Sequence, residues 1–286
     1  MPKADNSLDQ FYTKRETARD VISMINCDEF DLIIEPSAGA GDFLYNLPED
    51  RSIGIDLDPA GPKIRKGDFF NFVPCVGESI LTIGNPPYGK NSSLAVKFFN
   101  HAAQYSSCIA FILPRTFRKP SVINRLNQNF ILDQQKILPL KAFYTPDGES
   151  YSVPTVFQIW RKSVDKRKKI HTILSHEDFS FVKIKQNPSQ QDKQNQINNS
   201  DFCIRRVGAS AGKLYTDYRK IYRDWKSHYY IKQNVIIAKE IFASIEWDSL
   251  ESPKFDTAGN PSISKHDLIK HYDKRKKEYE LQIKKR

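Results

Sequence analysis

The sequence lacks the features that mark secreted, membrane-spanning and zinc-binding proteins. Only four of its 286 residues are cysteine, and Cys27, Cys75, Cys108 and Cys203 form no Cys-x-x-Cys pair. Scattered single cysteines argue against a disulfide framework and a zinc site, and they are typical of a reducing compartment. No apolar run approaches membrane-spanning length, and no basic-then-apolar signal segment opens the chain. We therefore expect an intracellular protein, cytoplasmic or associated with the nucleoid or nucleus, with no membrane and no metal.

Acidic residues are scarce in the second half of the chain. Residues 1–162 contain 18 Lys and Arg and 18 Asp and Glu, which leaves 26 of the 44 basic and 16 of the 34 acidic residues C-terminal to them. The whole formal charge of +10 therefore lies in residues 163–286. A polyanion such as DNA or RNA is the natural partner of such a surface. The alternative is a solvated basic tail, which fits the charge runs Asp273–Lys277 and Lys284–Arg286 best.

A glycine-containing turn follows the first apolar strand. Residues Asp31–Ile34 are predicted to form a short strand, and Glu35-Pro36-Ser37-Ala38-Gly39-Ala40-Gly41-Asp42-Phe43 comes directly after it. Gly39 and Gly41 have no Cβ, so the backbone there can approach a ligand closely. A helix is expected to begin near Asp42, and its free N–H groups favour an electronegative ligand group. The position between a strand and a helix is the context that a nucleotide-type site requires.

Acidic and aromatic residues follow the next two segments. The predicted strand Ser52–Ile55 ends in Asp56-Leu57-Asp58-Pro59, and a carboxylate at that position is placed to accept both hydroxyls of a ribose. Gly67-Asp68-Phe69-Phe70 comes next. Asp68 can accept from an adenine amino group and Phe69 can stack on the ring, whereas Phe70 is expected in the core.

The most informative motif is Asn85-Pro86-Pro87-Tyr88, which follows the apolar run Ser79–Ile83. Two consecutive prolines end the strand and fix the backbone beyond it. The motif offers an amide side chain, a carbonyl outside any ladder and an aromatic ring. An exocyclic amino group on a planar base needs two acceptors and a stacking partner, and this tetrapeptide supplies all three.

The combination of motifs resembles the class I S-adenosylmethionine-dependent amino-methyltransferases that act on N6 of adenine. Gln10–Ala18, which precedes the glycine turn, is similar to the Phe-x-Thr-Pro segment of the gamma-type DNA adenine methyltransferases, and the motif order is theirs. Lys14 departs from the pattern, since those enzymes usually carry proline there. The resemblance covers roughly residues 8–162. It implies a Rossmann-like class I methyltransferase sheet, here with a small basic C-terminal α+β extension, and a role such as restriction–modification, orphan regulation or a viral activity.

The resemblance also implies roles for individual residues. Asn85 and the Pro86 carbonyl would accept from the target amino group, with Pro87 holding the turn and Tyr88 stacking on the base. The residues expected to hold the cofactor S-adenosylmethionine are Thr13, Glu35, Pro36, Ala38, Gly39, Gly41, Asp56, Leu57, Asp68 and Phe69. The target adenine must be flipped out or unpaired, because it cannot be reached inside a duplex.

Several alternatives remain open at this point. An RNA adenine methyltransferase would share every motif, so DNA is favoured by motif order alone. A protein-glutamine methyltransferase also uses Asn-Pro-Pro-Tyr, but it normally has a helical domain before the cofactor motif. N4 of cytosine is a further target, although that group more often shows serine in place of Asn85. A non-catalytic nucleic-acid-binding partner of another methyltransferase is the alternative from a different class.

The pattern along the chain predicts a catalytic domain at residues 1–162 and a substrate-recognition extension at 163–286. Helices are predicted at Arg15–Asn26, Leu94–Gln104 and Ser264–Gln282, the last with Ser264 as N-cap, and strands at Cys108–Leu113, Lys136–Phe143, Val153–Trp160, Asp201–Val207 and Ser227–Ile231. Residues 187–200 are rich in Gln and Asn and are interpreted as a flexible loop. The candidate nucleic-acid contacts are Arg115, Arg118, Lys119, Arg205, Arg206 and Lys213, with Tyr215, Tyr218 and Tyr222 near the last three.

Overall fold

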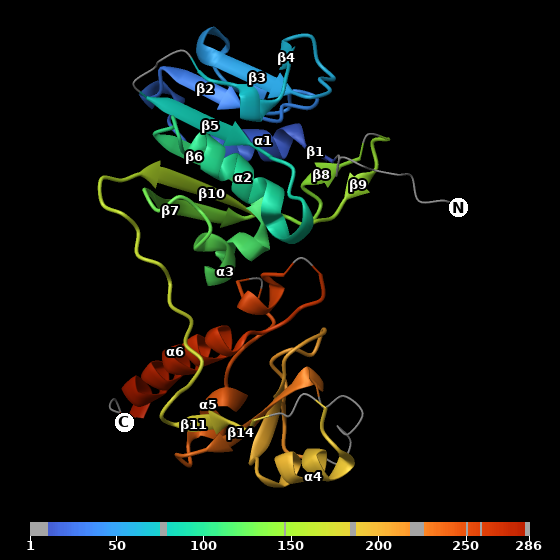
Figure 1. Cartoon of the computed structure of the whole chain (residues 1–286), viewed down its shortest axis with the longest axis vertical. Helices are drawn as coiled ribbons and strands as arrows, with labels where there is room; N and C mark the ends of the chain where they lie inside the picture. The colour runs from blue at the N-terminus through green and yellow to red at the C-terminus, as the bar shows by residue number, and fades with distance from the viewer. Residues whose placement is uncertain are drawn as a thin grey trace. The chain divides into compact units, whose positions relative to one another are not determined.

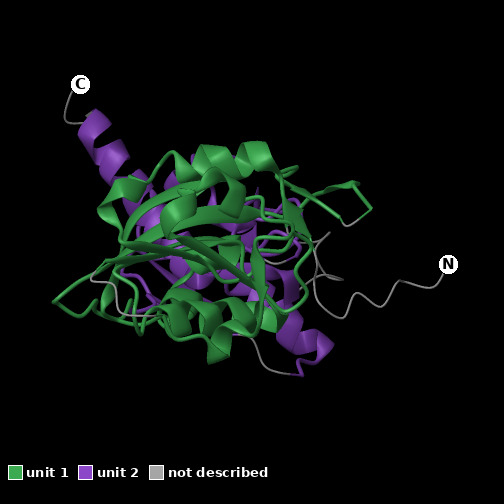
Figure 2. Cartoon of the chain, turned by 90° about the horizontal axis from the view of Figure 1, so that it is seen from above, with its two compact units in different colours: residues 1–170 green, residues 171–286 purple. Residues whose placement is uncertain are grey.

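The computed structural model describes residues 11–74, 79–145, 147–183, 187–217, 226–249, 251–257 and 259–283. Cys75, Tyr218, Tyr222 and Lys284–Arg286 therefore lie outside the described residues. The chain divides into two compact units, residues 1–170 and 171–286 (Figure 2). The boundary expected from the sequence, residue 162, is the last residue of the final strand of unit 1.

A seven-stranded, mostly parallel sheet forms the centre of unit 1 (Figure 1). Its strands, in spatial order, are β4 (Ile64–Lys66), β3 (Ser52–Asp56), β2 (Leu32–Glu35), β5 (Ile80–Gly84), β6 (Cys108–Pro114), β10 (Thr155–Lys162) and β7 (Phe130–Ile137). Strand β10 runs antiparallel to both of its neighbours, and the other neighbouring pairs are parallel. The Rossmann-like fold class predicted from the sequence is confirmed.

Helices cover both faces of this sheet. Alternate residues of β6 point to opposite faces, and every residue of the strand is buried. Helix α1 (Arg15–Ile22) packs on one face, whereas α2 (Ser93–Ala102) and α3 (Pro120–Ile123) pack on the other. Burial on both faces explains why β5 and β6 are continuously apolar in sequence.

A small second sheet brings the N-terminal strand beside a hairpin. Strand β1 (Tyr12–Thr13) pairs with β8 (Phe143–Tyr144), which pairs with β9 (Ser150–Tyr151). The register places Tyr12 opposite Tyr144 and Thr13 opposite Phe143. The segment before the glycine turn is thereby fixed to a hairpin more than 120 residues away in sequence.

Unit 2 is an α+β structure around a four-stranded antiparallel sheet, as the sequence predicted for the extension. The strand order is β11 (Phe179–Phe181), β14 (His228–Gln233), β12 (Phe202–Arg205) and β13 (Leu214–Tyr215). Helices α5 (Ala238–Ala243) and α6 (Lys265–Ile283) pack on one face. Ser264 and Asp267 form a reciprocal capping box at the start of α6, so the predicted N-cap is confirmed.

Four predicted elements differ from the structure. Residues 190–198 form helix α4 (Gln190–Asn198), started by a Ser189–Asp192 capping box, so the loop prediction was wrong there. The strand predicted at Lys136–Phe143 was misplaced, because β7 ends at Ile137 and β8 begins at Phe143. Helix α1 ends at Ile22 instead of Asn26. The helix expected near Asp42 is a single 3-10 turn, Leu44–Asn46.

Candidate active site

The glycine turn that follows β2 and the Asn-Pro-Pro-Tyr motif that follows β5 meet at the carboxyl edge of the sheet. Strand β3 lies on one side of β2 and β5 on the other, so the chain leaves these strands in opposite directions. A crevice forms at such a switch point, and open α/β sheets bind their ligands there. The Ser37 hydroxyl donates to the Asn85 carbonyl at 3.1 Å and joins the glycine turn to the Asn-Pro-Pro-Tyr motif.

The glycine turn packs its backbone directly against two aromatic rings. Gly39 has φ +50° and Gly41 has φ +86°. A Cβ on Gly39 would lie 2.7 Å from the Tyr12 ring, and one on Gly41 would lie 2.5 Å from the Tyr45 ring. Both the backbone conformation and the space therefore require glycine at these positions.

Asp56 fixes the conformation of this turn. One carboxylate oxygen accepts from the Gly39 N–H at 2.8 Å, and the other accepts from the Asp58 N–H at 2.8 Å. A carboxylate has about four lone-pair sites, so Asp56 retains acceptor capacity for a further ligand. The neighbouring Leu57 side chain is exposed and makes no contribution to the core.

Carboxylates surround the turn and make the crevice acidic. Burial raises the pKa of the Tyr12 phenol, and Asp56, Asp58 and Asp42 raise it further. Asp42 also accepts from the Tyr144 hydroxyl at 2.7 Å. Arg15 Nε lies 3.5 Å from Asp42 Oδ1 and offsets part of this charge, and the other carboxylates favour a cationic ligand.

Glu35 is a buried carboxyl beneath the turn. Its side chain is almost fully buried, and one of its oxygens accepts from the Leu44 N–H at 2.8 Å. Burial raises the pKa of this carboxyl well above its usual 4.5, although the Leu44 hydrogen bond acts in the opposite direction. The group therefore keeps its proton in the folded protein at pH values where the unfolded chain loses it.

The Glu35→Gln variant is expected to gain stability relative to the wild type as the pH rises above 4.5. The folded wild-type protein binds one proton more than the unfolded chain in that window, so its free energy of unfolding falls with pH. Each unit of pKa elevation corresponds to about 1.4 kcal/mol. Denaturant unfolding of both proteins at a series of pH values measures the difference, and a difference that does not change with pH contradicts the assignment.

Thr13 adds an unsatisfied polar group at the same edge. It is only 4% exposed, and its hydroxyl has no hydrogen-bond partner among the described residues. Buried hydroxyls are normally paired, so the group points to a ligand or a water. Pro36 and Ala38 belong to the glycine turn. Both are buried and apolar.

The Asn-Pro-Pro-Tyr motif presents two acceptors. The Tyr88 hydroxyl donates to Asn85 Oδ1 at 2.9 Å, which orients the amide and leaves one lone pair on that oxygen. Within the described residues the Pro86 carbonyl accepts no hydrogen bond. Gly84, which precedes the motif at φ +151°, would place a Cβ 3.3 Å from the Glu35 side chain. Burial raises the pKa of Tyr88 well above its usual value, so the phenol stays protonated and remains a donor.

An aromatic cluster lies beside the Asn-Pro-Pro-Tyr motif. Phe11 contacts Tyr88 edge-on with ring centroids 5.4 Å apart, and it also contacts Phe143 and Tyr151, each at 5.2 Å. Tyr151 is 42% exposed. Pairing of β1 with the β8–β9 hairpin brings these rings together.

Two neighbouring phenylalanines differ from their predicted environments. Phe69 is 2% exposed, and its ring stacks on Phe98 with centroids 5.2 Å apart. Phe70 is 37% exposed, so its prediction as a core residue was wrong. Asp68 caps the 3-10 turn that carries both rings by accepting from the Phe70 N–H at 2.9 Å. The turn directs Phe69 inward and Phe70 outward.

Of the three basic residues of unit 1 that were predicted to contact nucleic acid, one is buried. Arg115 is 4% exposed, which corrects its prediction as a phosphate contact, because a buried guanidinium cannot reach a polyanion. Arg118 and Lys119 are half-exposed and follow the carboxyl end of β6. They lie at the same edge of the sheet as the two motifs.

In unit 2, two cations stack on an aromatic pair. Arg206 Cζ lies 5.6 Å from the Tyr229 ring centroid, Lys265 Nζ lies 4.4 Å from the Phe181 centroid, and the two rings meet edge to face at 5.5 Å. We call these four residues the Arg206–Lys265 cluster. Burial lowers the pKa of Lys265, and repulsion from Arg206 lowers it further by a smaller amount. No ion pair to either cation occurs in the described part of the chain.

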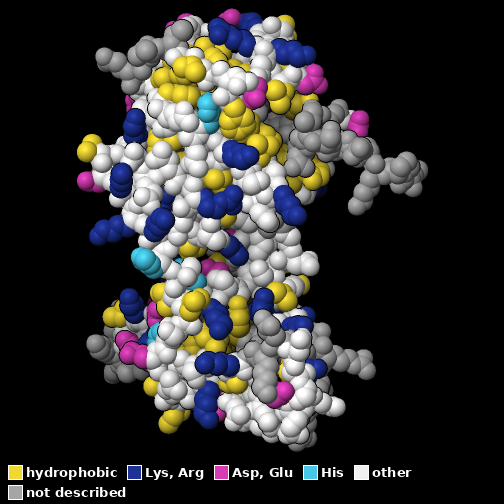
Figure 3. Space-filling model, viewed as in Figure 1, with side chains coloured by type: hydrophobic (Ala, Val, Ile, Leu, Met, Phe, Trp, Pro, Cys, Tyr) yellow, Lys and Arg dark blue, Asp and Glu magenta, His cyan; other side chains and the backbone are white. Residues whose placement is uncertain are grey.

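The other predicted contacts of unit 2 lie close by in sequence. Arg205 donates through Nε to the Val207 carbonyl at 3.0 Å, and Lys213 Nζ lies 5.5 Å from the Tyr215 ring centroid. Lys213 is exposed and Arg205 is half-exposed. On the face seen in Figure 3, Lys and Arg side chains are more numerous than those of Asp and Glu.

Among the described residues, no group of three or more His, Cys, Asp and Glu side chains is arranged to hold a metal ion. No helix in the same residues is both long and apolar enough for a membrane span.

Comparison of the sequence with protein-family profiles and with curated proteins gives no match. Among solved structures, similarity is found to a protein of Pyrococcus horikoshii assigned as an RNA methyltransferase, with 16% identity, a TM-score of 0.44, and coverage of 57% of this chain and 93% of that one. The 23S rRNA methyltransferase ErmE has 16% identity, a TM-score of 0.39, and coverage of 55% and 71%. A protein of Vibrio vulnificus YJ016 assigned as a type I restriction-enzyme modification subunit has 15% identity, a TM-score of 0.37, and coverage of 68% and 53%. The chain thus spans about half of that subunit's length.

Proposed function

We propose that the protein is an S-adenosylmethionine-dependent methyltransferase that modifies N6 of adenine in a nucleic acid, with DNA favoured over RNA. The observation that carries the proposal is the pair of acceptors, Asn85 Oδ1 and the Pro86 carbonyl, at the switch point of the sheet. They stand beside an acidic glycine turn joined to them through Ser37. The preference for DNA comes from the order of motifs in the sequence.

The crevice fits the chemistry of the cofactor. S-adenosylmethionine carries a sulfonium and an ammonium, and the carboxylates of Asp42, Asp56 and Asp58 around Tyr12 suit two positive charges. The unpaired Thr13 hydroxyl and the backbone of Ala38 and Gly39 would hold the methionine part. Asp56 would hold the ribose, while Asp68 would border the adenine ring. When bound, the cofactor supplies a methyl group on a strong electrophile, so the transfer needs no metal.

The protein's own residues act on the target amino group. The amino nitrogen of adenine is a poor nucleophile because its lone pair is delocalised into the ring. Asn85 Oδ1 and the Pro86 carbonyl accept hydrogen bonds from its two N–H groups. These hydrogen bonds localise the lone pair on nitrogen and stabilise the positive charge that develops there. Tyr88 stacks on the extruded base, with Phe11 and Tyr151 beside it. Alignment of the nitrogen with the methyl group supplies much of the remaining rate.

The experiment that tests this function is methyl transfer from isotope-labelled S-adenosylmethionine. Duplex DNA, single-stranded DNA, structured RNA and a protein extract serve as substrates, and digestion of the product identifies the modified group. We expect N6-methyladenine from one nucleic acid, and the substrate that yields it decides between DNA and RNA. Label in N4-methylcytosine or in protein would overturn the proposal, as would the absence of both transfer and cofactor binding.

The Arg206–Lys265 cluster is expected to contact the phosphate backbone. Each contacted phosphate contributes about 0.9 to the slope of log affinity against log salt on duplex DNA, or about 0.7 on single strands. Arg206→Ala and Lys265→Ala should each weaken binding regardless of sequence and reduce the slope by about 1. Lys274→Ala, an exposed position on the same helix as Lys265, serves as the charge-matched control. Equal slopes of log affinity against log salt for the wild type and the three variants would exclude the cluster from the interface.

A further inference from the structure

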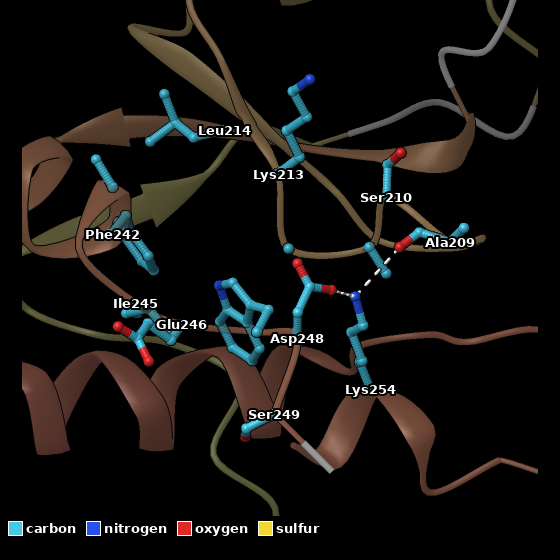
Figure 4. Close-up of a pocket in the computed structure, with 14 residues that line it drawn as sticks. Ala209, Ser210, Lys213, Leu214, Phe242, Ile245, Glu246, Asp248, Ser249 and Lys254 are labelled. Carbon is cyan, nitrogen blue, oxygen red and sulfur yellow. Dashed lines mark hydrogen bonds and ion pairs between the residues drawn. The ribbon is translucent and has the colours of Figure 1, made fainter. Parts of the chain in front are cut away.

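Unit 2 contains a cavity of about 750 Å³ that none of the roles above uses. Its walls come from the loop at residues 209–214, from the end of α5 and the segment after it at residues 242–249, and from Lys254 (Figure 4). Phe242, Ile245 and Trp247 supply apolar and aromatic wall, whereas Ser210, Asp248 and Lys254 supply polar groups. The lining therefore combines apolar and aromatic wall with several polar and charged side chains.

Trp247 contributes an unpaired donor. The residue is 6% exposed, and its indole N–H has no acceptor among the described residues. Gly212, at φ +96°, lies so close to the ring that a Cβ there would approach it to 2.3 Å. Contact with the loop on one side and with the His271 ring at 5.1 Å fixes the indole in place. A buried, immobile N–H without a partner is costly unless something accepts from it.

Lys254 contributes a second donor. Its side chain is 2% exposed, and its ammonium donates to the Asp248 carboxylate and to the Ala209 carbonyl at 3.2 Å (Figure 4). An ammonium has three N–H donors, so one remains beyond these two acceptors, and the Phe255 ring centroid lies 5.0 Å from Nζ. The Asp248 side chain is 92% exposed and keeps its second oxygen free to accept. The cavity thus combines the Lys254 ammonium with an exposed carboxylate, beside the fixed Trp247 ring.

We infer that this cavity binds a guanine base, as a nucleotide of the substrate strand outside its stack. This inference rests on the proposed action on nucleic acid. Guanine presents two acceptors, O6 and N7, on one edge, and Lys is an established partner of that pair. Its adjacent N1–H and N2 amino group donate together, which matches a carboxylate such as Asp248. Adenine and cytosine present an amino donor where O6 lies, and thymine and uracil have no second donor beside N3–H.

The charges of the lining select the base and not its phosphate. Glu246 and Asp248 are both exposed acids of the lining, and they repel a phosphate inside the cavity. Lys213 belongs to the same lining, but its ammonium points away from the Asp248–Lys254 pair (Figure 4). The cavity is large enough for one base, and the sugar and phosphate then remain at its mouth.

Binding of guanosine monophosphate to the full-length protein, measured by calorimetry and by tryptophan fluorescence, tests the inference. Single-stranded oligonucleotides that carry one guanine, inosine, 7-deazaguanine or adenine at the same position provide the second series. We expect guanine to bind at least tenfold more tightly than adenine, and inosine and 7-deazaguanine to fall between them. Binding of the free nucleotide without any preference among the oligonucleotides would identify a free guanine nucleotide as the ligand and would overturn the strand assignment.

Ala243→Phe blocks the cavity without disturbing the core, because Ala243 is exposed and lines its edge. This variant should weaken guanine binding at least tenfold, and Trp247→Phe should remove the fluorescence response. Ser180→Phe, at an exposed position of β11, is the matched control and should bind as the wild type does. No binding of guanosine monophosphate up to millimolar concentration, or unchanged guanine binding by Ala243→Phe, would overturn the guanine site. These outcomes are independent of methyl transfer, so failure of the proposed function is recognised separately by the labelling experiment.

Discussion

The Asn85→Ala variant is expected to lose methyl transfer by about 10²–10³-fold or more, the usual effect of removing one group that stabilises charge in a transition state. The loss should fall on kcat, because the amide oxygen acts on the amino group as positive charge develops there. Cofactor affinity should remain close to that of the wild type, since Asn85 contacts the glycine turn only through its backbone carbonyl. Single-turnover transfer and calorimetric binding of S-adenosylmethionine measure the two quantities separately.

Two matched variants separate the roles within the motif. Asn85→Asp retains an acceptor oxygen and should keep far more activity than Asn85→Ala. Tyr88→Phe keeps the ring but removes the hydroxyl that orients the amide at 2.9 Å, and it should cost about tenfold, the effect of one hydrogen bond. Undiminished turnover in Asn85→Ala would contradict the assigned mechanism, whatever the other variants do.

The central strands could be predicted from the sequence because burial on two faces makes them continuously apolar. Strands β2, β5 and β6 lie at the middle of the sheet and were placed to within about two residues. Strand β7 was missed because it lies at the edge of the sheet, where Asp133, Gln134 and Gln135 are tolerated. Most side chains of β7 are at least partly exposed, so the strand lacks the continuous apolar run that marks the central strands.

Helix α4 and the 3-10 turn after Gly41 were predicted wrongly, because both are determined by local contacts that composition does not reveal. Helix α4 was missed because its Gln- and Asn-rich sequence resembles a disordered segment, although Ser189 and Asp192 have the spacing of a capping box. The helix expected after Gly41 is a single 3-10 turn, whose first N–H donates to the buried carboxyl group of Glu35. Pro48 follows within a few residues and limits any extension.

Some residues of the candidate site could be predicted from the sequence, whereas others depend on contacts between distant segments. Motif order placed Thr13, the glycine turn, Asp56 and Asn85 near one edge of the sheet, because the carboxyl ends of parallel strands share an edge. The contribution of Phe11 and Tyr151 depends on pairing between β1 and the β8–β9 hairpin, which is a long-range contact. Arg115 was mistaken for a surface residue because the sequence around it has the composition of a loop, whereas the structure buries it.

The Asp56→Ala variant is expected to weaken S-adenosylmethionine binding by about 2–4 kcal/mol, that is by about 30- to 1,000-fold. The carboxylate has two tasks, since it fixes the turn through Gly39 and Asp58 and is proposed to accept from the ribose hydroxyls. At saturating cofactor kcat should change much less, because Asp56 does not belong to the Asn-Pro-Pro-Tyr motif. Asp58→Ala is the comparison variant: it keeps the backbone N–H from which Asp56 accepts and removes only a nearby charge, so it should weaken cofactor binding less than Asp56→Ala does.

A cofactor analogue without the ribose hydroxyls separates the two tasks of Asp56. If the carboxylate contacts the ribose, the analogue should lose affinity for the wild type but lose little more in Asp56→Ala, so the two changes will be strongly non-additive. If Asp56 acts only by holding the turn, the losses will add, and the proposed ribose contact will be wrong while the structural role remains. Calorimetry on the four protein–cofactor pairs gives the coupling energy directly, and a value near zero would leave the hydrogen bonds to Gly39 and Asp58 as the whole contribution of this residue.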